Sequence, residues 1–165
     1  MTRLISFIAL SLILIISSCG FKPANYVKND LGESMEVRLA SIVIKKSSGF
    51  RSQQLRTKIF DVINPSNIKT EPEYLLTITP HESQRSTFIT NLGSSGRMQL
   101  DVNIKYSLTE IATTKQVSKG SISSSESYNI DQNRFGNYNA KNFARESVYN
   151  SLAEKLRNVI IQDLD

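Results

Sequence analysis

The clearest pattern in the chain is a strict alternation of apolar and polar side chains between residues 98 and 109. Because successive side chains of a β-strand point to opposite faces of a sheet, the pattern predicts a long strand with one buried and one solvated face. A strand that is solvated on one face is typical of an antiparallel sheet. The apolar positions are Met98, Leu100, Val102, Ile104, Tyr106 and Leu108, and they alternate with Gln99, Asp101, Asn103, Lys105, Ser107 and Thr109.

Two segments before this strand also favour β structure. Residues 35–45 (MEVRLASIVIK) are rich in β-branched side chains and predict a first strand, with the apolar residues 42–44 covered on both faces. Residues 73–81 alternate Tyr74, Leu76 and Ile78, which predicts a second strand that continues extended through residues 85–92.

A fourth strand is predicted after the long alternating one. Residues 93–96 form a Gly-Ser-Ser-Gly turn before the alternating strand, and residues 112–115 turn the chain after it. Residues 116–128 then return as a more polar strand, which we place near an edge of the sheet.

Two segments carry the 3.6-residue period of an amphipathic helix. In residues 50–63 one stripe is apolar, and Asn64-Pro65 ends the helix because the residue before proline avoids the α region. The last helix is expected to begin at about Asn139, which is a plausible cap. The apolar stripes are Leu55, Ile59, Phe60, Val62 and Ile63 in the first helix, and Ala144, Val148, Tyr149, Leu152, Ala153, Leu156, Val159 and Ile160 in the last.

The predicted order is therefore strand, helix, three strands, helix. The simplest packing is an α+β fold with a four-stranded, mainly antiparallel sheet and two helices on one face. Residues 35–165 are long enough for a single domain with its own core.

The N-terminal segment has a different composition. Residues 1–18 (MTRLISFIALSLILIISS) have one positive charge, a short apolar run and two small residues, which is the pattern of a cleaved secretory signal. A membrane-spanning helix is the rival interpretation, but it needs about 20 apolar residues and this run is shorter. We predict a signal peptide at residues 1–18.

The only cysteine of the chain, Cys19, follows directly after this segment. Ile16-Ser17-Ser18-Cys19 resembles the bacterial lipobox, in which the thiol receives a diacylglyceryl group and the new amino terminus is then acylated, for example with palmitate. The alternative is a free thiol. Two or more acyl chains anchor a protein stably, whereas one holds weakly. Residues 19–34 are interpreted as lipid anchor and tether. In bacterial lipoproteins an Asp directly after the lipidated cysteine resembles a signal for retention in the inner membrane. This chain has Gly20 at that position, which favours an outer-membrane location on the periplasmic side.

Composition narrows the function classes. Without residues 1–18 the chain has 19 basic residues, which is the total of 20 less Arg3, against 15 acidic ones, so the net charge is +4. This mild charge permits an anionic partner without requiring one. Nucleic acid is not expected as a partner of an exported chain. With Cys19 acylated, no internal disulfide can form.

The sequence offers little for catalysis. It has a single histidine, His81, no second cysteine and no glycine-rich phosphate loop, so we expect neither a metal site, nor a cofactor, nor an enzyme. A lipid-anchored hydrolase that uses His81 is the remaining catalytic hypothesis.

Several segments resemble the LPS-assembly lipoprotein LptE family. They are Cys19-Gly20-Phe21, the predicted first strand at residues 35–45, the helical segment 54–59 (QLRTKI), the end of the alternating strand at 106–110 (YSLTE) and the segment 144–153 of the last helix. The resemblance covers nearly the whole chain. It implies a protein that sits in the lumen of the outer-membrane β-barrel LptD, assists the assembly of that barrel and binds lipopolysaccharide on its way to the outer leaflet.

The lipopolysaccharide-binding residues of the family do not carry over directly. Where the family's proposed basic residues fall, this chain has Thr90 and Asn91 near Phe88, and Gly136 before the last helix. The nearby basic residues Arg97, Arg134 and Lys141 are our candidates for lipopolysaccharide binding. The alternative function is an accessory, non-enzymatic lipoprotein of another envelope lipid transporter.

Overall fold

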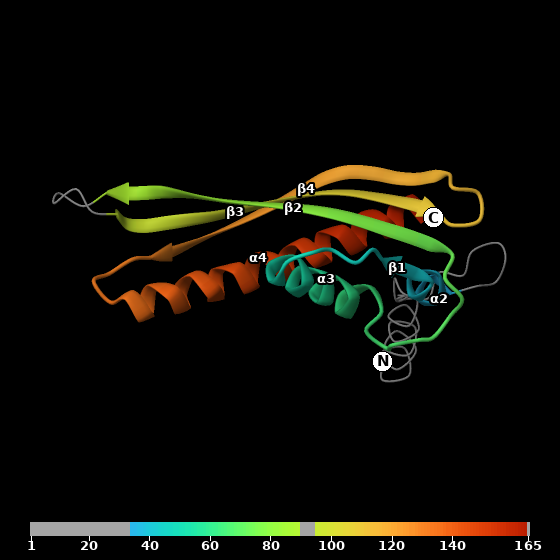
Figure 1. The fold of residues 1–165 in the computed structure, drawn as a ribbon, viewed down its shortest axis with the longest axis horizontal. Coiled ribbons are helices and arrows are strands. Elements are labelled where there is room, and N and C mark those ends of the chain that lie inside the picture. The colour runs from blue at the N-terminus through green and yellow to red at the C-terminus, as the bar shows by residue number, and fades with distance from the viewer. Residues whose placement is uncertain (1–33, 90–94, 165) are drawn as a thin grey trace, which may run out of the picture.

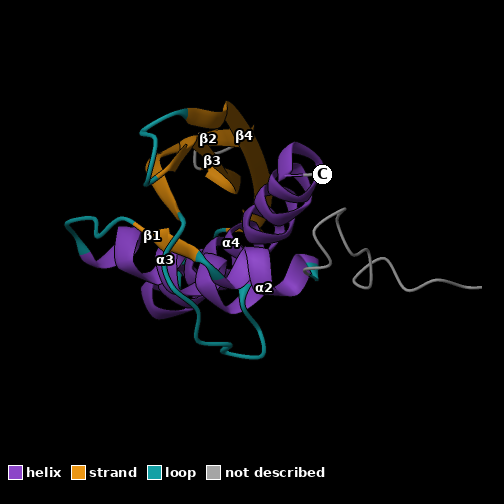
Figure 2. Cartoon of the chain, turned by 90° about the vertical axis from the view of Figure 1, so that its right-hand side faces the viewer, coloured by secondary structure: helices purple, strands orange, loops and turns teal. Residues whose placement is uncertain are grey.

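The computed structural model describes residues 34–89 and 95–164. Its elements are α2 (Met35–Ala40), β1 (Ile42–Ile44), α3 (Phe50–Ile63), β2 (Tyr74–Ile89), β3 (Ser95–Glu110), β4 (Gln116–Asn129) and α4 (Arg134–Leu164). The four strands form one sheet in the order β1-β2-β3-β4, with β1 parallel to β2 and the other pairs antiparallel. Both α3 and α4 lie on one side of β2–β4 (Figures 1 and 2). The predicted α+β fold is confirmed. The predicted signal, Cys19 and nearly all of the tether lie outside the described residues.

The alternating pattern of β3 is observed as predicted. Its even-numbered residues from Leu100 to Leu108 are buried, whereas Asp101, Asn103 and Lys105 are partly or fully exposed. Strand β2 aligns its own apolar residues with this face, because Leu76 pairs with Leu108 and Ile78 with Tyr106. The core therefore lies between this face of the sheet and the helices.

Strand β4 comes close to the core at a glycine. Gly120 is the cross-strand partner of Tyr106, and a Cβ at this position would lie 2.7 Å from the Tyr106 Oη. The aromatic ring therefore occupies the space that a side chain at position 120 would need.

The prediction of a strand across residues 35–45 was wrong for its first half. Residues 35–40 form the short helix α2, and only Ile42–Ile44 pair with β2. The content of β-branched residues suggested a strand, but Met35 and Leu39 are four residues apart, and both are buried from one face of a helix. Helix α2 is tied to the end of α4, because the Arg38 Nη1 donates a hydrogen bond to the Leu164 carbonyl.

Strand β1 differs from the prediction in a second respect. Ile42 and Ile44 are buried, but Val43 between them is 42% exposed, so only one face of the strand is covered. The helices pack on a single side of the sheet and leave the other side to solvent.

Helix α3 has the predicted limits. It begins after Gly49, whose φ of 94° is in the region that favours glycine. It ends before Asn64, whose side chain forms two hydrogen bonds with the backbone of Ile68. Leu55, Ile59 and Ile63 form its buried stripe.

Helix α4 begins one and a half turns before the predicted cap at Asn139. The Asn133 Oδ1 accepts hydrogen bonds from the backbone N–H groups of Phe135 and Gly136, so Asn133 caps the helix. The first ten residues of α4 have no buried apolar stripe, since the buried residues of the helix start at Ala144. The apolar pattern in the sequence therefore located the buried part of the helix and not its start. Figure 1 shows these first turns reaching past α3 toward the end where β2 and β3 are joined.

The outer edge of β2 is only partly covered. The Lys45 N–H donates to the Leu76 carbonyl at 2.8 Å, so the even-numbered residues of β2 direct their backbone groups toward this edge. Strand β1 pairs only with residues 74–76, and beyond them no other strand among the described residues joins this edge. Pro80 lies at an outward position, where its missing N–H interrupts the row of donors.

Candidate functional site

A groove of about 670 Å³ lies between α3 and the first half of α4. Its walls come from one stripe of each helix. In α3 the stripe consists of residues 50, 54, 57 and 58, and in α4 of residues 138, 141, 145 and 149. Neighbouring turns of each helix contribute residues that are three or four positions apart. Side chains with this spacing lie on one face of a helix, so the packing of α3 on α4 brings the two stripes together. The groove is lined by Phe50, Arg51, Gln54, Thr57, Lys58, Tyr138, Lys141, Asn142, Arg145, Glu146 and Tyr149.

The charges that line the groove are mostly positive. Arg51, Lys58, Lys141 and Arg145 stand against the single acid Glu146. The Lys58 Nζ lies 3.1 Å from the Glu146 Oε1, and this ion pair connects α3 to α4. In the described part of the chain, no ion pair is formed by Lys141.

A nearly buried ion pair connects β2 to α4 beside this groove. The Arg145 Nε and Nη2 donate to the two carboxylate oxygens of Glu82 at 3.0 and 2.9 Å, and Nη1 donates to the Asn142 Oδ1 at 2.8 Å. The side chains of Arg145 and Glu82 are 9% and 13% exposed. Arg51 of α3 approaches the same carboxylate at 3.4 Å.

The ion pair sets the electrostatics of this region. Hydrogen bonds from Arg145 hold the pKa of Glu82 below its usual 4.5, despite burial, with the charges of Arg145 and Arg51 acting in the same direction. Burial lowers the pKa of Lys141, and the neighbouring Arg145 guanidinium lowers it further. Burial raises the pKa of Tyr149. The groove therefore contains a lysine ammonium whose charge is not fully compensated.

The three predicted lipopolysaccharide-binding residues lie toward one end of the molecule but do not form one cluster. Arg97 is near the start of β3 beside Phe88, and together they line a shallow cavity at the joined end of β2 and β3. Arg134 is the first residue of α4, and Lys141 follows two turns later inside the groove. The same end exposes Phe88 and Phe135.

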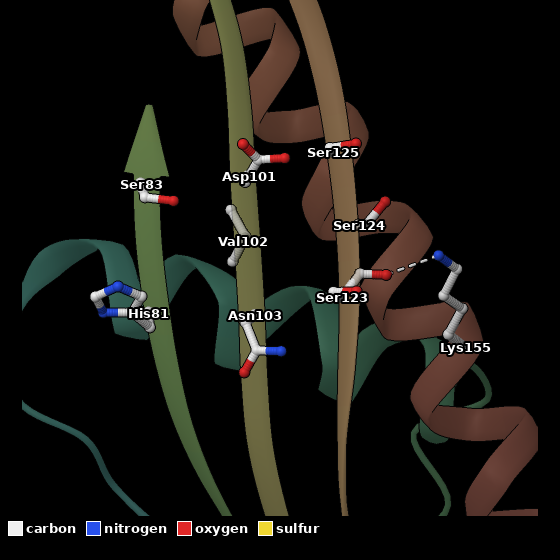
Figure 3. Close-up of a pocket in the computed structure, with 9 residues that line it drawn as sticks. All are labelled: His81, Ser83, Asp101, Val102, Asn103, Ser123, Ser124, Ser125 and Lys155. Atoms are coloured by element: carbon white, nitrogen blue, oxygen red, sulfur yellow. Dashed lines mark hydrogen bonds between the residues drawn. The ribbon is translucent and has the colours of Figure 1, made fainter. Parts of the chain in front are cut away.

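The solvated face of the sheet is a second polar surface. His81 and Ser83 of β2, Asp101 and Asn103 of β3, and Ser123 and Ser125 of β4 lie side by side on three strands (Figure 3). At its margin the Lys155 Nζ donates to the Ser123 carbonyl at 2.8 Å, which ties α4 to the edge strand.

The hypothesis of a hydrolase depends on His81. Its cross-strand partner is Asn103. The nearby carboxylate of Asp101 accepts a hydrogen bond from Gln99 and lies 3.3 Å from Arg85. These contacts engage Asp101 with residues other than His81. No group of three or more potential metal ligands occurs among residues 34–89 and 95–164, and no helix in those ranges is long and apolar enough to cross a membrane.

Sequence reasoning missed the Glu82–Arg145 pair and the groove beside it. Each of the two residues is a charged side chain at a position that the apolar pattern assigns to the core. Glu82 is an even-numbered residue of β2, like the buried Leu76 and Ile78. Arg145 lies in α4 between the buried Ala144 and Val148. Two opposite charges on core-facing positions favour a buried pair. The pattern alone does not give the α3–α4 crossing that forms the groove.

Comparison with solved structures shows which proteins share this fold. A protein from Caulobacter crescentus that is provisionally assigned as a lipoprotein matches with a TM-score of 0.66 and 18% identity, over 79% of this chain and 94% of that one. The rare lipoprotein B from Shewanella oneidensis matches with a TM-score of 0.57 and 12% identity, over 73% and 93%. A minor lipoprotein from Acinetobacter baumannii matches with a TM-score of 0.53 and 13% identity, over 74% and 89%. No protein-family model and no curated protein matches the sequence. The chain thus has a fold that occurs in bacterial lipoproteins.

Proposed function

We propose that this chain is a lipoprotein of the Gram-negative outer membrane, anchored on the periplasmic side through acylated Cys19. In this proposal it plugs an LptD-type β-barrel, assists its assembly and takes part in lipopolysaccharide transport to the outer leaflet, by binding and not by catalysis. The observation that carries the proposal is the fold shared with bacterial lipoproteins over 73–79% of the chain, together with the lipobox-like segment that ends at Cys19.

The polar face of the sheet supports the role of a plug. The interior of a large membrane barrel is polar, so a protein that fills it needs a polar exterior. The face around Ser83, Asp101, Asn103, Ser123 and Ser125 consists of hydroxyl, amide and carboxylate groups that can exchange hydrogen bonds with such a wall.

The basic end supports a role in binding lipopolysaccharide. Arg97, Arg134 and Lys141 offer cations for the phosphates of lipid A, and charge-assisted hydrogen bonds to phosphate are strong. The exposed rings of Phe88 and Phe135 lie at the same end and could contact acyl chains.

Purification under mild detergent tests the partner. The full chain with a C-terminal tag should retain an LptD-type barrel, and its depletion should leave lipopolysaccharide inside the cell. A Cys19→Ala variant should lose the membrane anchor and serves as the control for localisation. Recovery of a free monomer would contradict the proposal, whereas co-purification with inner-membrane transport proteins would favour the accessory-lipoprotein alternative.

Binding of purified lipopolysaccharide tests the candidate residues. The triple variant of Arg97, Arg134 and Lys141 to alanine should bind lipopolysaccharide more weakly than the wild type. A matched triple variant of the exposed Lys105, Lys115 and Lys119 removes the same charge elsewhere. Equal losses in the two variants would show that only net charge matters.

A further inference from the structure

In the groove between α3 and α4, the described residues leave two aromatic rings largely exposed. Phe50 at the start of α3 is 74% exposed and Tyr138 in the second turn of α4 is 64% exposed. Both line the groove, with the buried Tyr149 from the same stripe of α4 as Tyr138. Burial of large rings is strongly favourable, so aromatics gathered in a concave site are the usual anchors of a binding surface.

The charges around these rings select an anionic occupant. The Lys58–Glu146 and Arg145–Glu82 pairs are internally matched. Lys141 has no ion-pair partner among the described residues, and Arg51 makes only a 3.4 Å contact with a carboxylate that already has Arg145. The groove therefore retains positive charge next to its aromatic rings.

The mixture of aromatic rings with polar and charged side chains in the lining favours a protein segment over an acyl chain. Eight of the eleven lining residues are polar or charged, and among them Gln54, Thr57 and Asn142 carry amide or hydroxyl groups that can bond to a peptide backbone. An acyl chain would cover these groups without replacing their hydrogen bonds to water, which is costly. A second copy of this chain is disfavoured because it would bring a net positive protein to a positive groove.

We propose that the α3–α4 groove docks an acidic segment of a partner protein, with carboxylates at Lys141 and Arg51 and an apolar side chain between Phe50 and Tyr138. Aromatic residues and arginine are enriched in protein interfaces, and the groove presents Phe50, Tyr138 and Arg51. This inference does not depend on the barrel or on lipopolysaccharide, and it holds for any partner that presents such a segment.

Site-specific photocrosslinking in living cells tests the proposal. The full-length lipoprotein carries p-benzoylphenylalanine in place of Tyr138, and mass spectrometry identifies the captured peptide. A protein adduct should form at a segment rich in Asp and Glu. The matched control places the same photoreactive residue at Phe143, which is on the same helix and 70% exposed but does not line the groove. This control should not capture that segment.

Charge reversal supplies the second arm. Lys141→Glu and, separately, the more exposed Arg51→Glu should each reduce the adduct by about tenfold, since each places a carboxylate against a carboxylate. Lys105→Glu on the solvated face of the sheet should leave it unchanged. A reciprocal Glu→Lys change in the captured segment should restore the adduct of the Lys141→Glu protein. Thermal unfolding of each purified variant confirms that it is folded.

Four kinds of adduct would overturn the proposal. These are an adduct with lipid alone, an adduct with a second copy of this chain, a captured segment without acidic residues, and an adduct that Arg51→Glu and Lys141→Glu leave undiminished. The absence of any adduct at position 138 would also overturn it. Lys141 is also a candidate for lipopolysaccharide binding, so Arg51→Glu, which changes the groove and none of those candidates, is the variant that separates the failure of this proposal from the failure of the lipopolysaccharide-transport function.

Discussion

The Glu82–Arg145 pair should contribute strongly to stability, and removal of one partner tests this directly. Two charge-assisted hydrogen bonds of 3.0 and 2.9 Å join side chains that are only 9% and 13% exposed. Loss of one member of a fully buried pair costs about 3–5 kcal/mol, because the other charge stays in the core without its partner. Arg51 and Asn142 remain as partial partners, so we expect the low end, about 3 kcal/mol, for Glu82→Leu and for Arg145→Met.

The assay is thermal unfolding of the purified lipoprotein in detergent, followed by circular dichroism. A loss of about 3 kcal/mol in a domain of this size lowers the Tm by about 10 °C. The double variant should be much closer to the wild type than the sum of the single losses, with a coupling of at least about 2 kcal/mol, because no charge is then left unpaired. Glu146→Gln is the matched control: it removes the exposed pair with Lys58 and should cost under about 1 kcal/mol.

The same pair predicts a pH dependence with a defined sign. The pKa of Glu82 in the folded protein is below its ordinary 4.5, so its stabilisation is present above that pH and is lost as the pH falls through the lowered folded pKa. The difference in Tm between the wild type and Glu82→Leu should therefore shrink below pH 4.5. The reasoning is refuted if Glu82→Leu costs no more than Glu146→Gln, or if its penalty is the same at every pH.

Three further variants probe local geometry by thermal unfolding. Gly49→Ala should cost about 1–3 kcal/mol, because φ is 94° there while the space around the position is open, and an unchanged Tm would argue against that backbone conformation. Gly120→Ala should cost about 1–3 kcal/mol, because its Cβ meets the Tyr106 hydroxyl, and the loss should be smaller in a Tyr106→Phe background; equal losses in both backgrounds would contradict the contact. Asn133→Ala should cost about 1 kcal/mol, because it removes the cap of α4, and Asn139→Ala should cost less. A larger loss for Asn139→Ala than for Asn133→Ala would place the cap at Asn139, as the sequence suggested.

The regular elements were predictable where the sequence period matched a single buried face. In β3 the alternation of period two coincides with burial from Leu100 to Leu108, and in α3 the stripe of Leu55, Ile59 and Ile63 coincides with the core. Residues 35–40 show why the prediction fails for short segments, because six residues fit the period of a strand and that of a helix equally well. In the folded protein this segment is helical, and Arg38 contacts the end of α4, which is distant in the sequence.

The candidate site was harder to predict because it depends on packing. Lys141 was identified from its charge, but the wall opposite it comes from α3, more than 80 residues earlier in the sequence. The extension of α4 before Ala144 was missed for a related reason: Phe135, Tyr138 and Phe143 are apolar but exposed, so they do not follow the stripe that marks the core. Such exposed aromatic residues lie outside the core, so the periodicity of the core does not locate them.

The part of the β2 edge that no described strand covers has a consequence for how copies of this chain meet one another. A long strand with unpaired N–H and C=O groups is a template on which another chain can add a strand, and this is a common start of aggregation. Pro80 removes one outward donor, and the register shifts between Ser86 and Ile89 distort the edge further along. These two features interrupt the row of backbone groups to which an added strand would bond. We therefore expect Pro80 to hinder self-association through this edge, a property that neither the core nor the groove would reveal.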